Sequence, residues 1–167
     1  MTRDGLDPTQ VGTAGQLRFA MLAILGSDGA IEPVPPLADD EGRDFELHLR
    51  HRFDRTIAIQ VKVATAQWRP GLLYVEFARG KRRPISPWYW YFVAYLDLDR
   101  LDFQDPIFLI PSTALRRGGR VIGRAYLSLD RASHDRWTRY RVTRRALGTR
   151  LVQILEGSSA LKARVAA

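Results

Sequence analysis

The sequence predicts a single domain of the α/β or α+β class, in which helices pack on a β-sheet. Apolar residues recur every three or four positions near both ends of the chain, and through its middle they alternate with polar residues. The resulting order of helix, several strands and helix is typical of a sheet with helices packed on it. The 167 residues, of which 46% are hydrophobic and 26% charged, suffice for one domain with its own core.

The first part of the chain predicts an arm, a helix and a short strand. Residues 1–10 are polar and are expected to form a flexible arm. Apolar side chains in residues 11–25 have helical spacing, and Gly26 follows as a stop signal. Residues 30–34 predict a short strand, which Pro33 restricts to a sheet edge or a strand end.

Two runs with strict alternation follow, at residues 44–50 and 57–64. A polar turn at residues 52–55 separates them, so we predict a β-hairpin with one apolar face. The polar face of this hairpin carries Asp44, Glu46, His48, Gln60 and Lys62.

The remainder predicts more strands and a closing helix. Strands are expected at residues 72–77, 88–98 and 106–110, a helical turn at 112–115 that Ser112 could cap, and a helix at 139–155. The folded domain therefore spans residues 11–156, and residues 157–167 are expected to fray. Two basic segments are predicted to be loops, one with Arg79, Lys81, Arg82 and Arg83 and the other with Arg116, Arg117 and Arg120.

Composition excludes several kinds of site. The chain has no cysteine, which rules out disulfides, Cys-ligated zinc, iron–sulfur clusters and a thiol nucleophile. No apolar run approaches the roughly 20 residues of a membrane helix, and the first residues do not resemble a signal peptide, so no membrane association and a cytoplasmic location are the expectation. The three histidines have no ligand spacing between them.

The net charge of +8 and the pI of about 10.4 favour a polyanionic partner, because neutralised phosphates release counterions. Nucleic acid is the partner expected from this charge, with the two basic segments as candidate phosphate contacts. An arginine-rich surface and ordinary solvated loops would explain the same residues. Six aromatic residues could stack on bases, although core packing explains aromatic strand residues more simply: Trp68, Trp88, Trp90, Trp137, Tyr89 and Tyr91.

The polar face of the hairpin could carry metal-dependent chemistry. Alternation puts Gln60 and Lys62 on one face, about 7 Å apart along the strand. Asp44 begins the partner strand on the same face. Phosphodiester hydrolysis with a divalent metal requires oxygen ligands and a cation that stabilises developing charge, and these three side chains could supply both.

The acid Asp44, the alternating strand after it, and the run Ile59-Gln60-Val61-Lys62 resemble the PD-(D/E)XK nuclease-like (restriction endonuclease-like) superfamily. In that superfamily an acid at the start of the second core strand is followed by (D/E/Q)-x-K on the third. The pair Gly15-Gln16 resembles the Gly-Glu pair on the first helix of many members. The likeness extends over most of residues 11–155, but its specific part spans about 25 residues.

The resemblance implies a restriction-endonuclease-like core, with a central mixed sheet flanked by an N-terminal and a C-terminal helix. It also implies a nuclease dependent on Mg²⁺ or Mn²⁺, acting on nucleic acid and most directly on DNA, with a homodimer as an optional partner. Asp44, Gln60 and the Val61 carbonyl would bind the metal, and Lys62 would position the attacking water. Gln16 and Glu46 would act from the second shell.

Two positions leave an alternative open. Gln60 and Gln16 stand where many members carry acids, and both replacements remove negative charge and lower the expected affinity for Mg²⁺. The alternative is a catalytically weakened or inactive nuclease-fold module that binds nucleic acid or a protein partner. A basic structural or interaction protein unrelated to nucleases is the third hypothesis.

Overall fold

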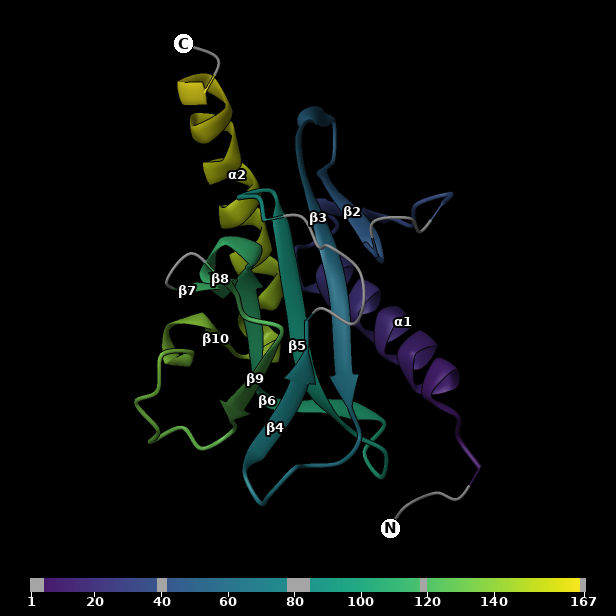
Figure 1. The fold of residues 1–167 in the computed structure, drawn as a ribbon. Coiled ribbons are helices and arrows are strands. Elements are labelled where there is room, and N and C mark those ends of the chain that lie inside the picture. The colour runs from purple at the N-terminus through teal and green to yellow at the C-terminus, as the bar shows by residue number, and fades with distance from the viewer. Residues whose placement is uncertain (1–4, 39–41, 78–84, 118–119, 166–167) are drawn as a thin grey trace.

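The computed structural model describes residues 5–38, 42–77, 85–117 and 120–165 (Figure 1). Two long helices stand near the ends of the chain, α1 (Pro8–Gly26) and α2 (Leu147–Val165). The strands are β1 (Ile31–Val34), β2 (Phe45–Leu49), β3 (Arg52–Ala64), β4 (Leu72–Glu76), β5 (Tyr89–Asp97), β6 (Asp102–Pro111), β7 (Arg116–Arg117), β8 (Arg120–Val121), β9 (Arg124–Ser128) and β10 (Arg141–Val142). Short 3-10 turns span Ser112–Leu115, Thr138–Tyr140 and Arg144–Ala146.

A six-stranded mixed sheet forms the centre, in the order β1-β2-β3-β5-β6-β10. Only β3 and β5 pair in parallel, and the remaining neighbours in this sheet are antiparallel. A parallel pair requires a crossover. Within the described residues this crossover contains β4, which pairs with β9 as a separate two-stranded ribbon.

Each face of the sheet has its own core. Both helices pack on one face, where Phe19 of α1 and Leu151 of α2 meet Ile59 of β3. The β4–β9 ribbon covers the other face, where Leu73 and Leu127 pack against residues of β5 and β6. In Figure 1 the ribbon lies in front of the sheet and the helices lie behind it. The predicted α+β architecture, a mixed central sheet with an N-terminal and a C-terminal helix, is confirmed.

The predicted hairpin forms, but its turn lies at Arg50 and His51, and β3 begins at Arg52, inside the turn predicted at residues 52–55. Phe45, Leu47 and Leu49 are buried while Glu46 and His48 between them are not, as alternation predicts. The short strand β1 lies at the edge of the sheet, the position that a proline at 33 permits. The turn after β6 also forms, but the hydroxyl of Ser112 donates to the Ser86 carbonyl rather than capping the turn.

The expected N-terminal arm is too long, because α1 begins at Pro8 rather than residue 11. Asp7 caps the helix: its carboxylate accepts from the backbone N–H groups of Thr9 and Gln10, and the Gln10 side chain accepts from the Asp7 N–H. Proline at the first helical position is already in a helical backbone conformation. This capping box orders residues that their polarity alone assigned to a loose segment.

The predicted boundaries of the last helix are also wrong at both ends. Residues 139–146 form two 3-10 turns separated by β10, and α2 starts at Leu147. Arg141 and Val142 pair with Phe108 and Ile107 of β6, so a long-range strand contact replaces the first turns of the expected helix. At the other end, the backbone of α2 continues to Val165, through most of the expected frayed tail.

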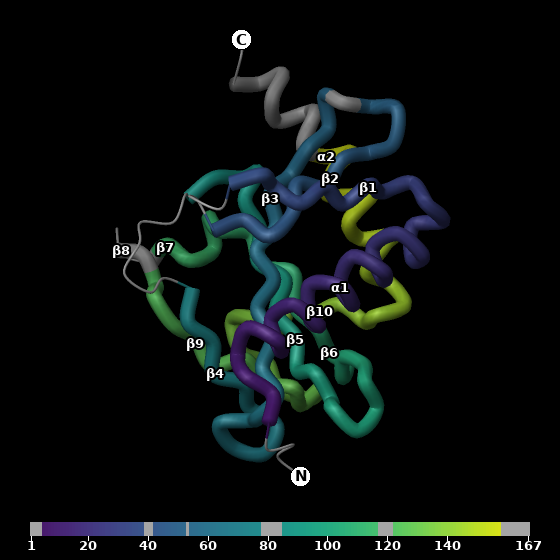
Figure 2. The backbone as a smooth tube through the Cα atoms, turned by 90° about the vertical axis from the view of Figure 1, so that its right-hand side faces the viewer, coloured from purple at the N-terminus to yellow at the C-terminus, as the bar shows by residue number. Residues whose placement is uncertain are grey.

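The end of α1 contacts the start of α2 through glycines, and Figure 2 shows both helices on the side of the sheet away from β4 and β9. A Cβ atom added at Gly148 would overlap the carbonyl group of Gly26 and the amide nitrogen of Ser27. The two backbones therefore touch directly, which is possible only because position 148 has no side chain. Within the described ranges, neither helix combines the length and the apolar content that a transmembrane helix requires.

A cluster of charged residues ties the helices to β6. Arg18 of α1 donates from Nε to Asp102 at 2.9 Å and also ion-pairs with it, and Arg144 contacts the other Asp102 oxygen. The Arg144 backbone N–H donates to the carboxylate of Asp105 at 2.7 Å. Burial raises the pKa of Asp102, but the hydrogen bonds from Arg18 and the Phe103 N–H and the two arginine charges outweigh it. The net pKa therefore lies below the ordinary value.

Replacing Asp102 with asparagine is expected to lower the free energy of unfolding at neutral pH by about 1–3 kcal/mol. The lowered pKa of the folded carboxyl means that its contribution is present above the ordinary value of 3.8 and is lost as the pH falls through the folded pKa. The difference between wild type and Asp102→Asn is therefore expected to close in acid. Urea unfolding at neutral pH and below 3.8 measures this, with the exposed Asp99→Asn as the control. A difference independent of pH would contradict the assignment.

Candidate active site

Asp44 lies immediately before β2. The partner strand β3 extends past this point, from Ile59, which pairs with Phe45, to Ala64. The Asp44 N–H donates to the Ile59 carbonyl at 2.8 Å, so Ile59 directs its backbone groups toward β2. Alternate residues of a strand point the same way, and Val61 therefore also faces this side. Its N–H finds the carboxylate of Asp44, with Oδ2 at 2.6 Å, in place of a further backbone partner.

The second oxygen of Asp44 connects the strand to α1. Gln16 donates from Nε2 to Asp44 Oδ1 at 2.8 Å. This contact requires α1 to lie close to β3, and the neighbouring Gly15 permits that approach: an added Cβ would lie 2.6 Å from Cγ1 of Val63. The structure thus joins Gln16 and Asp44, two of the predicted site residues, across 28 positions of sequence.

Gln60 and Lys62 alternate with the valines that pack under the helices, so they belong to the opposite face of β3. Extending the observed register from Phe45↔Ile59 by one step places Gln60 opposite Asp44. The Gln60 side chain is only 6% exposed, and its Oε1 has no hydrogen-bond partner among the described residues. A buried acceptor without a partner costs about 1–3 kcal/mol, so this oxygen favours an additional ligand.

Lys62 is half-buried and lines a cavity of about 500 Å³ between the first turns of α1 and the end of β3. Pro8 and Val11 line the helix side of this cavity, and Thr65 lies just past the strand. Val61 and Val63 also line this cavity, so it opens on the α1 side of β3, the face opposite to that of the Gln60 side chain.

The carboxylate of Glu46 takes part in a different set of contacts. It ion-pairs with Arg43 at 2.9 Å and lies 3.8 Å from the ring of His48. These contacts place the Glu46 carboxylate in a charge cluster with Arg43 and His48, which is an alternative to its expected role beside Asp44.

The donor atoms at this site suit a hard divalent cation in kind, because they are a carboxylate, an amide oxygen and a backbone carbonyl. The two Asp44 oxygens accept from Gln16 and from the Val61 N–H, and a carboxylate has about four lone-pair sites in all. Across the described part of the chain, no group of three or more His, Cys, Asp or Glu residues is arranged to hold a metal. A metal here would rely on one negative ligand.

The two basic segments attach near each other. Phe77 donates to the Gly123 carbonyl at 2.8 Å, so the end of β4 and the start of β9 lie together. The predicted loop with Arg79, Lys81, Arg82 and Arg83 follows Phe77 and falls outside the described residues. The other segment is a short ribbon rather than a loop: Arg117 pairs with Arg120, and Arg116 is exposed.

One hydrogen bond connects this region to Asp44. The Tyr89 hydroxyl, shortly after the first basic segment, donates to the Gly42 carbonyl at 2.9 Å. Gly42 lies two residues before Asp44 and has a φ of 69°, a conformation that favours glycine. The chain that carries the first basic segment therefore returns to the sheet beside the candidate site.

Some of the aromatic residues that were candidates for base stacking are buried, and Trp68 is exposed. Tyr89, Tyr91 and Trp137 are buried in the core under the ribbon, as the core-packing interpretation predicts, so these three rings are not available to stack on bases. Trp68 is 58% exposed.

Two tyrosines that were not predicted as site residues lie beside Trp68. The ring centroids of Tyr74 and Tyr126 are 5.7 and 6.0 Å from that of Trp68. These tyrosines are paired across β4 and β9 on the outer face of the ribbon. Alternation within residues 124–128 was the available signal. The hydrogen bond from the Tyr74 hydroxyl to Glu76 raises the pKa of Tyr74.

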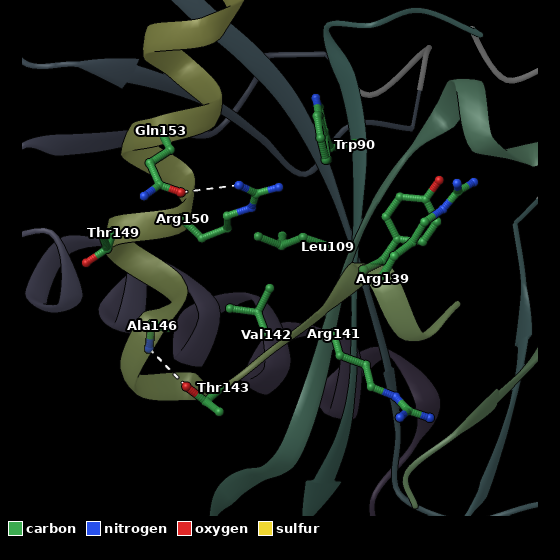
Figure 3. Close-up of a pocket in the computed structure, with 11 residues that line it drawn as sticks. Trp90, Leu109, Arg139, Arg141, Val142, Thr143, Ala146, Thr149, Arg150 and Gln153 are labelled. Atoms are coloured by element: carbon green, nitrogen blue, oxygen red, sulfur yellow. Dashed lines mark hydrogen bonds between the residues drawn. The ribbon is translucent and has the colours of Figure 1, made fainter. Parts of the chain in front are cut away.

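A separate cavity of about 700 Å³ lies between α2 and β10 (Figure 3). Trp90 and Leu109, which pack with the helix-side core, line it together with Arg139 and Arg150. It is therefore on the opposite face of the sheet from Gln60 and Lys62. Among the described residues its lining contains no carboxylate and therefore no negatively charged ligand for a hard cation.

No family model matches the sequence, and no curated protein is significantly similar to it. Among solved structures, the chain is similar to a bacterial homing endonuclease, I-Ssp6803I, with a TM-score of 0.60 and 15% sequence identity. The match covers 94% of this chain and 98% of the endonuclease, so the likeness extends over the whole architecture. The chain therefore has a nuclease-like fold.

Proposed function

We propose that this chain is a metal-dependent nuclease of the PD-(D/E)XK type, which hydrolyses phosphodiester bonds of nucleic acid, with DNA as the first substrate to test. The observation that carries the proposal is the Asp44 carboxylate, which accepts from Gln16 and from the Val61 N–H. The strand register places Asp44 opposite Gln60, whose buried side-chain oxygen has no hydrogen-bond partner among the described residues. The likeness to a homing endonuclease supports the same function at the level of fold.

Each residue has a distinct task in this proposal. Asp44, the Gln60 side-chain oxygen and the Val61 carbonyl would hold Mg²⁺ or Mn²⁺, which would supply Lewis-acid polarisation of a phosphate oxygen and of a water molecule. Lys62 positions the attacking water and stabilises the negative charge that develops on the phosphate. Gln16 orients Asp44 through its hydrogen bond.

The basic segments contribute binding. Their positive side chains grip the phosphate backbone without reading sequence. Both segments attach at the same end of the β4–β9 ribbon, and one returns to the sheet at Tyr89, beside Gly42. A nucleic-acid strand bound by these basic segments would pass close to Asp44. The net charge of +8 supports binding to a polyanion in general.

A second candidate function has its own support. Among the described residues only the carboxylate of Asp44 is placed at the site, and these residues contain no cluster of three acidic or histidine side chains that could hold a metal. A single charged ligand weakens the affinity for a divalent cation. The alternative is a nuclease-fold module that binds nucleic acid, or a protein partner, without cutting.

Cleavage and binding assays on single- and double-stranded DNA and RNA, with Mg²⁺, Mn²⁺ or a chelator, separate these functions. Lys62→Met retains an unbranched apolar side chain and removes the charge, so we expect cleavage roughly 100-fold slower or more, with little change in binding. Lys162→Met, a lysine near the end of the chain, is the matched control.

The outcomes distinguish three cases. Metal-dependent cleavage that falls in Lys62→Met and not in Lys162→Met supports the nuclease. Binding with a steep salt dependence but no cleavage by the wild type supports the module. The absence of both cleavage and nucleic-acid binding at low salt would contradict the nuclease and the nucleic-acid-binding module.

A further inference from the structure

The outward face of α1 carries no charged residue and is apolar except for Gln10 and Thr13 near its start. Leu17 and Leu25 are each 67% exposed, and Met21 and Ile24 are 40% and 41% exposed. We call the exposed residues on this side the α1 stripe: Gln10, Thr13, Ala14, Leu17, Met21, Ile24 and Leu25. At 3.6 residues per turn these positions fall within an arc of about 120°.

The opposite side of the same helix is already packed in the core. Gly15, Phe19 and Ala23 are buried there, so α1 is apolar on both sides. A helix that is hydrophobic all round is typical of a helix buried on all sides. The other helix shows the usual arrangement, because its exposed positions include Arg150, Gln153 and Glu156.

We propose that the α1 stripe is the contact surface between two copies of this chain. Each copy carries a net charge of +8, so two copies repel over most of their surfaces. The only charged residue of α1 is Arg18, and its guanidinium is engaged by Asp102. The stripe is therefore a surface on which two copies meet without opposing like charges.

Other occupants fit this surface less well. A nucleic acid would find no cation along the stripe to neutralise its phosphates. A lipid surface favours helices with lysine and arginine flanking the apolar face, and α1 has none outside the pair with Asp102. A second copy needs neither feature.

The distribution of side-chain sizes favours an antiparallel two-fold pairing. The small residues Thr13 and Ala14 lie in the first half of the helix, and the large residues Ile24 and Leu25 lie in the second half. A crossing centred between Leu17 and Met21 places the large residues of each copy over the small residues of the other. Such a contact is self-complementary, as a two-fold interface requires.

The dimer is expected to dissociate in the micromolar range, because one helix face is small beside the roughly 800 Å² per partner of a standard interface. The test is sedimentation equilibrium of the nucleic-acid-free protein over a micromolar concentration series. We expect the double variant Leu17→Glu/Met21→Glu to raise the Kd at least ~30-fold, because its carboxylates would be buried without partners.

Leu37→Glu is the matched control, because Leu37 is fully exposed and lies outside α1. Far-UV circular dichroism verifies that each variant is folded. A dimer in the wild type and in Leu37→Glu, with a monomer in the double variant, supports the proposal. A wild type that stays monomeric throughout the series, or a dimer that survives in the double variant, overturns it. None of these outcomes depends on nuclease activity.

Discussion

Asparagine in place of Asp44 is expected to slow metal-dependent cleavage by about 100- to 1,000-fold. The substitution removes the negative charge of the proposed metal ligand while preserving the shape of the side chain. Its amide oxygen can still accept from the Val61 N–H, which now bonds Oδ2 at 2.6 Å. The free energy of unfolding is therefore expected to fall by no more than about 1–2 kcal/mol. Cleavage rates at saturating Mn²⁺, with denaturant unfolding of the same samples, separate loss of activity from loss of fold.

Glu46→Gln is the appropriate control for this experiment. Glu46 is an acid on the same strand, two residues away, and it ion-pairs with Arg43. Its loss is expected to change cleavage by no more than a few-fold. If Asp44→Asn cleaved as fast as the wild type, or if Glu46→Gln were the more damaging change, the assignment of the metal ligand to Asp44 would be wrong.

Alanine in place of Gly148 is expected to destabilise the fold by about 3 kcal/mol or more. The added methyl group would overlap the carbonyl group of Gly26, and a helix backbone cannot move aside as a flexible side chain can. Relief requires the two helices to separate, which opens the core that Phe19 and Leu151 share with the sheet. Thermal and urea unfolding measure the effect directly.

The same helix offers a matched control in Gly157, where an added Cβ has no neighbour within 4 Å. Gly157→Ala is expected to be neutral or to stabilise the protein by up to about 1 kcal/mol, because alanine favours helix more than glycine does. Equal stability of the two variants would show that the contact between helix backbones does not form.

Local sequence patterns predicted the parts of the fold that depend on neighbouring residues. Period-two alternation placed the β2–β3 hairpin, and one proline placed β1 at the edge. The start of α1 was also readable, because an Asp with Gln three residues later and a Pro between them is a capping signature. Polarity of the first ten residues concealed it. The start of α2 was not readable, since Arg141 and Val142 become a strand only through pairing with β6.

The candidate site divides in the same way. Alternation predicted that Asp44, Gln60 and Lys62 belong to one hairpin, because the two strands of a hairpin are neighbours in the sequence. The contact between Gln16 and Asp44 depends on how closely α1 approaches β3, which Gly15 determines through its distance to Val63. The approach of Gly148 to Gly26 likewise depends on packing between opposite ends of the chain. A sequence pattern contains no direct information about such distances.

The three attachments of α1 have a mechanical consequence. Gly15 rests on β3, Arg18 is bound to β6, and Gly26 touches α2, so the helix is fixed near its middle and at its end. It has little freedom to rotate about its own axis without disturbing one of these points. Gln16, which holds Asp44, is adjacent in sequence to the exposed Leu17. A displacement of α1 by a contact at Leu17 would therefore also move Gln16, and with it the hydrogen bond to the Asp44 carboxylate on which the proposed chemistry depends.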